Sequence, residues 1–83
     1  MSRYQTINQP ITVLGVYTNG QFVPKKFRWG QRVLHIDSIT LTANTTDGGT
    51  KQRLVSVVSG SEVYRLRFDR EQEKWWLEEI WVE

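Results

Sequence analysis

The pair of side chains in this sequence that most resembles catalytic machinery is His35 with Asp37. The two stand two residues apart, so in a strand they face the same side and the carboxylate can orient the imidazole. A nucleophile or a metal is still needed, and neither Ser38 nor Ser56 lies in a recognisable motif. A lone histidine on the outer face of a strand is usually a tolerated polar residue. We therefore expect a non-catalytic protein with no catalytic residue, no metal and no cofactor.

Cationic side chains interleaved with an indole form a second set that suggests chemistry. The set consists of Lys26, Arg28, Arg65, Arg67 and Trp76. In the strand register that the turns predict, Lys26 and Arg28 share an outer face, and Arg65 and Arg67 share an outer face next to Trp76. Small barrels use such surfaces to bind single-stranded nucleic acid, because cations follow the phosphates and rings stack on bases.

A structural interpretation of the same residues stays open. Arg65 can pair with Glu78, and Arg67 can lie over Trp76 in a cation–π contact. Outward charges also protect a sheet against edge-to-edge aggregation.

The tryptophans near the carboxyl end suggest an interface. Trp75 and Trp76 are adjacent, so one of them points away from the core, and Trp81 also falls on the outer face. Exposed tryptophans often mark a contact with a partner. They can equally cover the open end of a barrel or form a homodimer contact.

The elements that position these residues follow a period of two, with Gly, Asn and Asp clusters between short apolar runs, which is typical of antiparallel strands. The sequence predicts an all-β protein, a six-stranded antiparallel meander that forms a small SH3-like barrel or a strongly coiled sheet. Residues 1–9 are expected to be a flexible lead-in and residues 10–83 a single domain. The predicted strands are Ile11–Tyr17, Gln21–Trp29, Arg32–Thr42, Gln52–Ser59, Glu62–Asp69 and Trp75–Val82, with a long loop at Ala43–Thr50.

Turn chemistry fixes the register of these strands. A turn at Gly30–Gln31 places Phe27 opposite Leu34, and turns at Asn19–Gly20 and Gly60–Ser61 are favoured in the same way. A four-residue loop at Arg70–Glu73, followed by a β-bulge at Glu78–Glu79, keeps the apolar residues of the last strand inside. The predicted core is Leu14, Val16, Phe27, Trp29, Leu34, Ile36, Val55, Val57, Tyr64, Leu66, Phe68, Trp75, Leu77 and Ile80.

The composition bears on the cellular compartment and on the kind of partner. The chain has 83 residues, a net charge of +2 and no cysteine, so no disulfide stabilises it and a reducing cytoplasm is expected. There is no apolar run of membrane-spanning length and no signal-peptide core at the start, so no membrane association is expected. The charge permits a nucleic-acid partner without requiring one.

Two segments resemble a known family. VPKKFRWGQRVLHIDSI and EVYRLRFDREQEKWWLEEIWV resemble the opening and the ending of the DUF6504-like family of small bacterial domains of unknown function. Some members are encoded near translesion DNA polymerase genes, so the resemblance implies a DNA-repair accessory. The central LTANTTDGGTKQR lacks the Trp-containing stretch of the relatives. The matching positions are Pro24, Phe27, Trp29, Val33, Ile36, Tyr64, Leu66, Asp69, Trp75 and Leu77.

The sequence thus favours a binding module for single-stranded nucleic acid or for a DNA-repair protein, acting through Lys26, Arg28, Arg65, Arg67, Trp76 and Trp81. The alternative is a protein-interaction module, or a homodimerising domain, that uses the exposed tryptophans.

Overall fold

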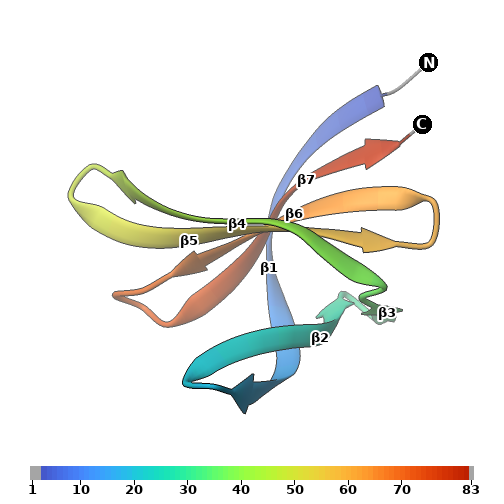
Figure 1. Cartoon of the computed structure of the whole chain (residues 1–83). Coiled ribbons are helices and arrows are strands. Elements are labelled where there is room, and N and C mark those ends of the chain that lie inside the picture. Colours follow the sequence, from blue (N-terminus) through green and yellow to red (C-terminus); the bar gives the residue numbers. More distant parts are fainter. Residues whose placement is uncertain (1–2, 83) are drawn as a thin grey trace.

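The chain folds into one antiparallel sheet of seven strands in the computed structural model, which describes residues 3–82 (Figure 1). The order of strands across the sheet is β3-β2-β1-β7-β6-β5-β4. Among the described strands, β3 and β4 form no ladder with each other, so the sheet is not closed into a barrel. The strands are β1 (Arg3–Thr18), β2 (Gln21–Trp29), β3 (Arg32–His35), β4 (Ser38–Asp47), β5 (Thr50–Ser59), β6 (Glu62–Asp69) and β7 (Lys74–Val82).

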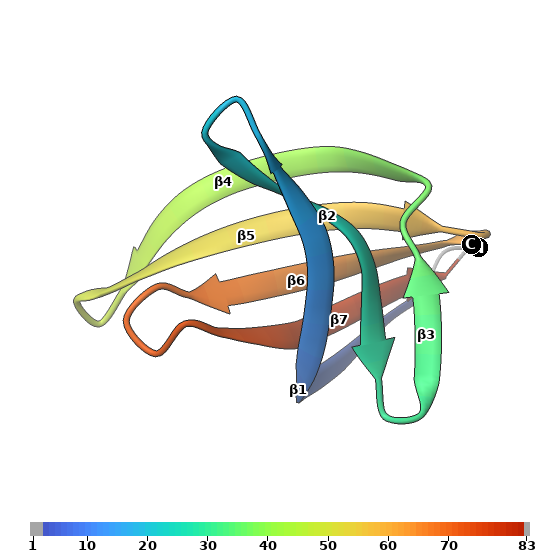
Figure 2. The same ribbon diagram turned by 90° about the horizontal axis from the view of Figure 1, so that it is seen from below.

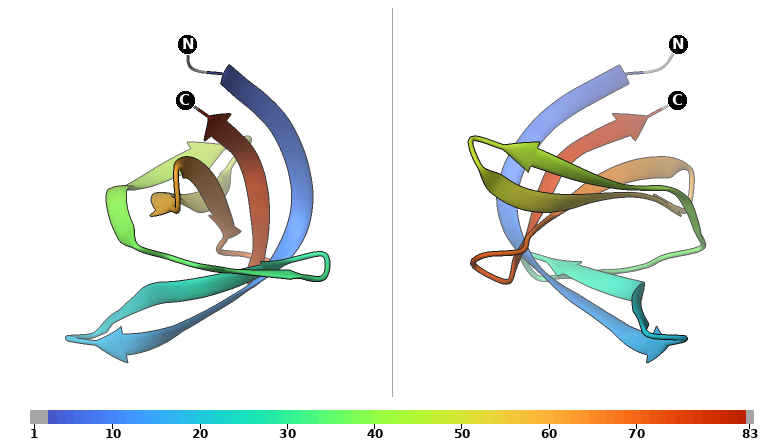
Figure 3. Two further views of the ribbon diagram at one scale, coloured as in Figure 1. Left: turned by 90° about the vertical axis from the view of Figure 1, so that its right-hand side faces the viewer. Right: turned by 60° about the vertical axis from the view of Figure 1, so that its left-hand side comes forward.

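The long strand β1 bends the sheet. Its first half pairs with β7, from Arg3 opposite Val82 to Ile11 opposite Trp75, and its second half pairs with β2. Because the two halves of one strand serve two ladders, the β2–β3 hairpin folds over the concave side of β4–β7 (Figures 2 and 3). The predicted start of the first strand at Ile11 is therefore wrong. From Arg3 onward, the expected lead-in is part of β1, and residues 1–2 lie outside the described residues.

The predicted strand Arg32–Thr42 is in fact two strands, which is why the sheet has seven strands and not six. At the break, the amide of Ile36 still donates to the carbonyl of Lys25 at 2.9 Å, whereas the amide of Asp37 donates to the carbonyl of Val58 at 2.8 Å. The chain changes its hydrogen-bonding partner between these two residues. The alternation changes phase at the break, because the apolar positions move from Leu34 and Ile36 to Ile39 and Leu41. The prediction of one continuous strand overlooked this change.

The predicted loop Ala43–Thr50 is mostly strand. β4 and β5 pair as far as Asp47 opposite Thr50, and only Gly48 and Gly49 form the turn. Both glycines have positive φ, 59° and 86°, as a type I′ turn requires. The polar side chains of this segment suggested a mobile loop, but the two-glycine turn favours a tight hairpin.

The other turns and their registers are confirmed. Phe27 lies opposite Leu34, and Val57 lies opposite Tyr64. Leu66 lies opposite Leu77, and the ladder of β6 with β7 shifts by one residue after this pair. The predicted bulge at Glu78–Glu79 is thus present, and it brings Ile80 to the inner face opposite Tyr64.

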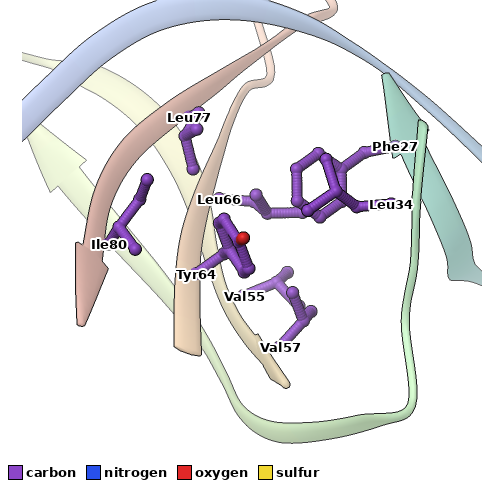
Figure 4. Close-up of a cluster of buried hydrophobic side chains, with 8 residues drawn as sticks. All are labelled: Phe27, Leu34, Val55, Val57, Tyr64, Leu66, Leu77 and Ile80. Carbon is purple, nitrogen blue, oxygen red and sulfur yellow. The ribbon is translucent and has the colours of Figure 1, made fainter. Parts of the chain in front are cut away.

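The core lies between the two folded halves of the sheet (Figure 4). The rings of Phe27 from β2 and Tyr64 from β6 meet edge to face at 5.3 Å, a geometry that aromatic pairs prefer. The buried apolar residues are Phe27, Leu34, Val55, Val57, Tyr64, Leu66, Leu77 and Ile80. Of the other predicted core residues, Trp29, Ile36, Phe68 and Trp75 are half-buried.

Leu14 and Val16, both predicted to be in the core, are exposed. Val13 is the residue of β1 that faces Phe27 and packs against the core, so its neighbour Leu14 points outward beside Lys26. The register of β1 with β2 shifts between Leu14 and Gly15.

In residues 3–82 no helix is long and apolar enough to cross a membrane.

Candidate functional site

The two arginines of β6 are neutralised on the outer face. Arg65 Nη1 lies 2.8 Å from Glu79 Oε1, and Arg67 Nε lies 3.3 Å from Glu78 Oε2. The β-bulge supplies an extra residue of β7 here, so each arginine has its own carboxylate. The expected pair of Arg65 with Glu78 is therefore wrong, because the bulge brings Glu79 opposite Arg65.

The outer tryptophans are separated from each other. Trp76 lies under Arg67, whose guanidinium carbon is 5.4 Å from the ring centroid, as the structural interpretation predicted. Trp81 lies farther along β7, is 41% exposed and packs against the ring of Tyr4 at 5.0 Å. Only Trp76 therefore lies with the arginines of β6.

Lys26 and Arg28 share the outer face of β2, opposite Leu14 and Thr12 of β1. Arg28 Nε donates to the carbonyl of Gly30 at 3.1 Å. Neither cation has an acidic partner within residues 3–82. Strands β1 and β7 separate them from Arg65 and Arg67, so the outer cations form two groups and not one continuous patch.

Asp37 stabilises the β5–β6 turn by a hydrogen bond. Its Oδ2 accepts a hydrogen bond from the amide of Gly60 at 2.8 Å, which ties the start of β4 to the β5–β6 turn. His35 is exposed on β3, opposite Lys26. The described part of the chain contains no group of three His, Asp or Glu residues placed to hold a metal ion.

The concave side carries a feature that the sequence analysis missed. Between the β1–β2 hairpin and strands β4–β7 lies a cleft of about 600 Å³, which we call the aromatic cleft. One wall comes from Phe22 and Pro24 of β2, and the opposite rim from Ile39 and Thr42 of β4. The cleft is the space that remains because the sheet does not close.

Four aromatic rings in contact line this cleft. Tyr17 lies 5.3 Å from Phe22, Phe22 lies 6.2 Å from Trp75, and Trp75 lies 4.9 Å from Phe68, centroid to centroid. All four residues line the cleft. Tyr17 is 80% exposed at one end of the row, so the row runs from solvent to the half-buried Trp75 and Phe68.

Two cations and one carboxylate complete the cleft. Arg53 of β5 is half-buried there, and its Nε lies 3.4 Å from Asn44 Oδ1. Arg70 and Glu73 come from the β6–β7 turn and are exposed. Within residues 3–82 neither arginine forms an ion pair, in contrast to Arg65 and Arg67.

The turn that carries Arg70 is held in place by Asp69. Asp69 Oδ1 accepts hydrogen bonds from the amides of Glu71 and Gln72 at 2.9 and 3.0 Å, a local pairing that favours turns. The amide of Arg70 donates to the carbonyl of Lys51 at 3.0 Å. The backbone of Arg70 is therefore fixed at the mouth of the cleft, and the residue is exposed to solvent there.

The tight approach of β1 and β2 depends on Gly15. A Cβ at this position would collide with the carbonyl oxygen of Val23 and would lie 2.9 Å from Phe22 Cζ and from Pro24 Cα. The absence of a side chain at Gly15 thus allows Phe22 to lie over β1 and to join the row of rings.

Part of this site could be found by strand alternation. Arg53 stands two residues before the inward-facing Val55, so alternation already places it on the inner face. Arg53 lines the same cleft as Tyr17 and Phe22 because β1 bends over the sheet. No local sequence pattern predicts that bend.

The chain matches no protein-family model, and searches of curated proteins and of solved structures found no significant match. The DUF6504-like resemblance therefore stays a hypothesis.

Proposed function

We propose that this chain is a non-catalytic binding module that holds single-stranded nucleic acid in the aromatic cleft. The observation that carries the proposal is the row of four contacting rings beside Arg53 and Arg70. Bases stack on aromatic rings whatever their identity, at about 1–3 kcal/mol per base, and arginines bind the phosphates. The cleft volume of about 600 Å³ is sufficient for a base.

The cleft fits this role better than the outer face does. Arg65 and Arg67 already have carboxylate partners, so a phosphate would have to displace them. Arg53 and Arg70 have no such competitor in the described part of the chain, apart from the nearby Glu73. We assign Arg65, Arg67 and Trp76 to the stability of the sheet, and Lys26 and Arg28 to long-range attraction of the ligand.

The proposed setting is DNA repair in the bacterial cytoplasm. Its support is the resemblance of two segments to the DUF6504-like family, together with the cysteine-free composition. The likeness to SH3-type small barrels also belongs to this proposal, because an open, strongly bent sheet of this size leaves a groove where such barrels bind ligands.

The test is titration of a fluorescein-labelled oligothymidylate, followed by anisotropy in about 50 mM salt. We expect binding that weakens steeply with salt. The double variant Arg53→Ala/Arg70→Ala should bind at least about tenfold more weakly, and its salt slope should fall by about 1.4, since each phosphate contact to a single strand contributes about 0.7.

The matched control is Lys26→Ala/Arg28→Ala, which removes the same charge from the outer face. It should lower the affinity by less than about threefold, because unpaired surface cations act mainly through the long-range field. Absence of binding by the wild type, or a larger loss in this control than in the cleft variant, contradicts the proposal.

A second candidate function rests on Tyr4 and Trp81. Their rings are in contact at a tilt of 43°, and both residues are exposed, 55% and 41%, which is the pattern of a protein-contact site. A partner protein, such as a DNA-repair enzyme, would bind there and not in the cleft. Loss of partner binding in Trp81→Ala, with oligothymidylate binding intact, would support this second function.

A further inference from the structure

The two edges of the sheet differ in how they are protected. The β3 edge has only four residues, and one of them is the cation Arg32. Short length and positive charge are the usual means by which proteins prevent edge-to-edge pairing. The β4 edge has ten residues and carries no ionisable side chain from Ser38 to Thr46. Neither strand pairs on its outer side with another described strand.

β4 also exposes aliphatic side chains. Ile39 is 38% exposed and Leu41 is 49% exposed, although β4 pairs with β5 along its other edge. After the irregularity near Thr40, the register places Leu41, Ala43 and Thr45 on the outer face, and Thr42 and Asn44 on the inner face. A long, uncharged edge with exposed aliphatic residues is a site for the addition of a further strand.

We propose that β4 pairs with β4 of a second copy of this chain, antiparallel, about a two-fold axis at Ala43. In this register Leu41 lies opposite Thr45 of the second copy, and Thr42 lies opposite Asn44. The pairing brings no two like charges opposite each other, which would destabilise it. The axis places Asp47 opposite Ile39, away from its own counterpart. The net charge of +2 per chain adds only weak repulsion.

The shape of the molecule leaves room for this pairing. The tip of the β4–β5 hairpin projects away from the β1–β2 hairpin, so the second half of β4 is open to an approaching strand (Figures 1 and 3). The first half also reaches solvent, because Ile39 and Leu41 are exposed there. A two-fold axis normal to the sheet keeps both concave faces on the same side. The two aromatic clefts, whose rims include Ile39 and Thr42, then open on one face of a continuous sheet.

The absence of native cysteine permits a direct test of the register. In Ala43→Cys, the two introduced thiols lie directly opposite each other, with Cβ atoms about 4.5–5.5 Å apart, which is close to disulfide range. We expect a disulfide-linked dimer to form readily on mild oxidation. Thr45→Cys, whose opposite residue is Leu41, and Ser61→Cys in an exposed turn should cross-link at least about tenfold more slowly.

Light scattering tests the dimer without cross-linking. We expect the wild type to dimerise at about 100 µM, since a single added strand gives an interface at the weak end of the known range. Ala43→Lys places two ammonium groups opposite each other and should be monomeric, with Leu41→Lys as a second variant in case the first is unfolded. Val33→Lys on the β3 edge is the control and should dimerise like the wild type.

A monomeric wild type at about 1 mM overturns the proposal. So does a dimer that persists in a folded lysine variant of β4, or equal cross-linking at Ala43 and Ser61. A dimer lost in Trp81→Ala but retained in Ala43→Lys would place the interface at Tyr4 and Trp81 instead. None of these outcomes depends on nucleic-acid binding, so the dimer and the proposed function succeed or fail separately.

Discussion

At the scale of single residues, the β-bulge of β7 decides the role of the outer arginines. Glu79 is only 6% exposed, and Arg65 is the cation that compensates its charge. Glu78, the partner of Arg67, is more exposed. The two ion pairs look alike in the sequence, yet only one of them holds a buried carboxylate.

This difference predicts unequal stabilities for two matched variants. Arg65→Met should lower the free energy of unfolding by about 1–3 kcal/mol, because it leaves Glu79 buried without a partner, with part of the effect screened by solvent. Arg67→Met should cost less than about 1 kcal/mol. Urea unfolding of both variants measures the two losses, and equal losses would contradict the distinction.

Tyr64 is the residue whose titration should affect stability. Burial, with its hydrogen bond to Glu62 Oε2 at 2.8 Å, raises the pKa of Tyr64 to about 12. An unfolded tyrosine titrates at about 10, so the folded chain holds this proton more tightly. The resulting stabilisation is complete below pH 10 and is lost as the pH rises through about 12.

We therefore expect the wild type to lose about 2 kcal/mol more than Tyr64→Phe between about pH 9 and pH 11.5. The comparison cancels the titration of lysines and of other tyrosines, which both proteins share. Urea unfolding at the two pH values gives the difference. A parallel decline in the two proteins would show that Tyr64 keeps an ordinary pKa.

At the scale of elements, the β1–β2 hairpin forms the wall of the aromatic cleft, and Gly15 permits its close approach. Gly15→Ala should cost about 1–3 kcal/mol, as overpacking does, and should displace Phe22 and weaken oligothymidylate binding. Val16→Ala, at an exposed neighbouring position, should change stability by less than about 0.5 kcal/mol. Urea unfolding and anisotropy test both variants, and an unchanged affinity in Gly15→Ala would remove Phe22 from the site.

Elements were predictable wherever turn chemistry and alternation agreed. The hairpins at Gly30–Gln31 and Gly60–Ser61 have the predicted registers. The break at Ile36–Asp37 was missed although the apolar positions change phase between Ile36 and Ile39, because no Gly or Pro marks a turn there. The first half of β1 pairs with β7, a segment far away in the sequence. A local pattern cannot reveal such a pairing, and the opening segment was therefore predicted to be a lead-in.

At the scale of the whole molecule, the sheet bends over itself without closing, and both proposed contact sites lie at that opening. The aromatic cleft lies in the gap, and the unprotected β4 edge forms one rim of it. All-β class and much of the core were predictable from alternation. Whether the sheet closes into a barrel was not predictable from alternation. Closure requires β3 to pair with β4, and the lengths and bends of all seven strands together decide whether they do.

The most direct test of the central claim is chemical-shift mapping of the ¹⁵N-labelled chain against oligothymidylate at low salt. We predict that the largest changes fall on the Trp75 indole and on the amides of Phe22, Thr42, Arg53 and Arg70. Little change should occur at Trp76 and Arg65 on the outer face. Changes confined to Lys26, Arg28, Arg65, Arg67 and Trp76, with the aromatic cleft unaffected, would contradict the account.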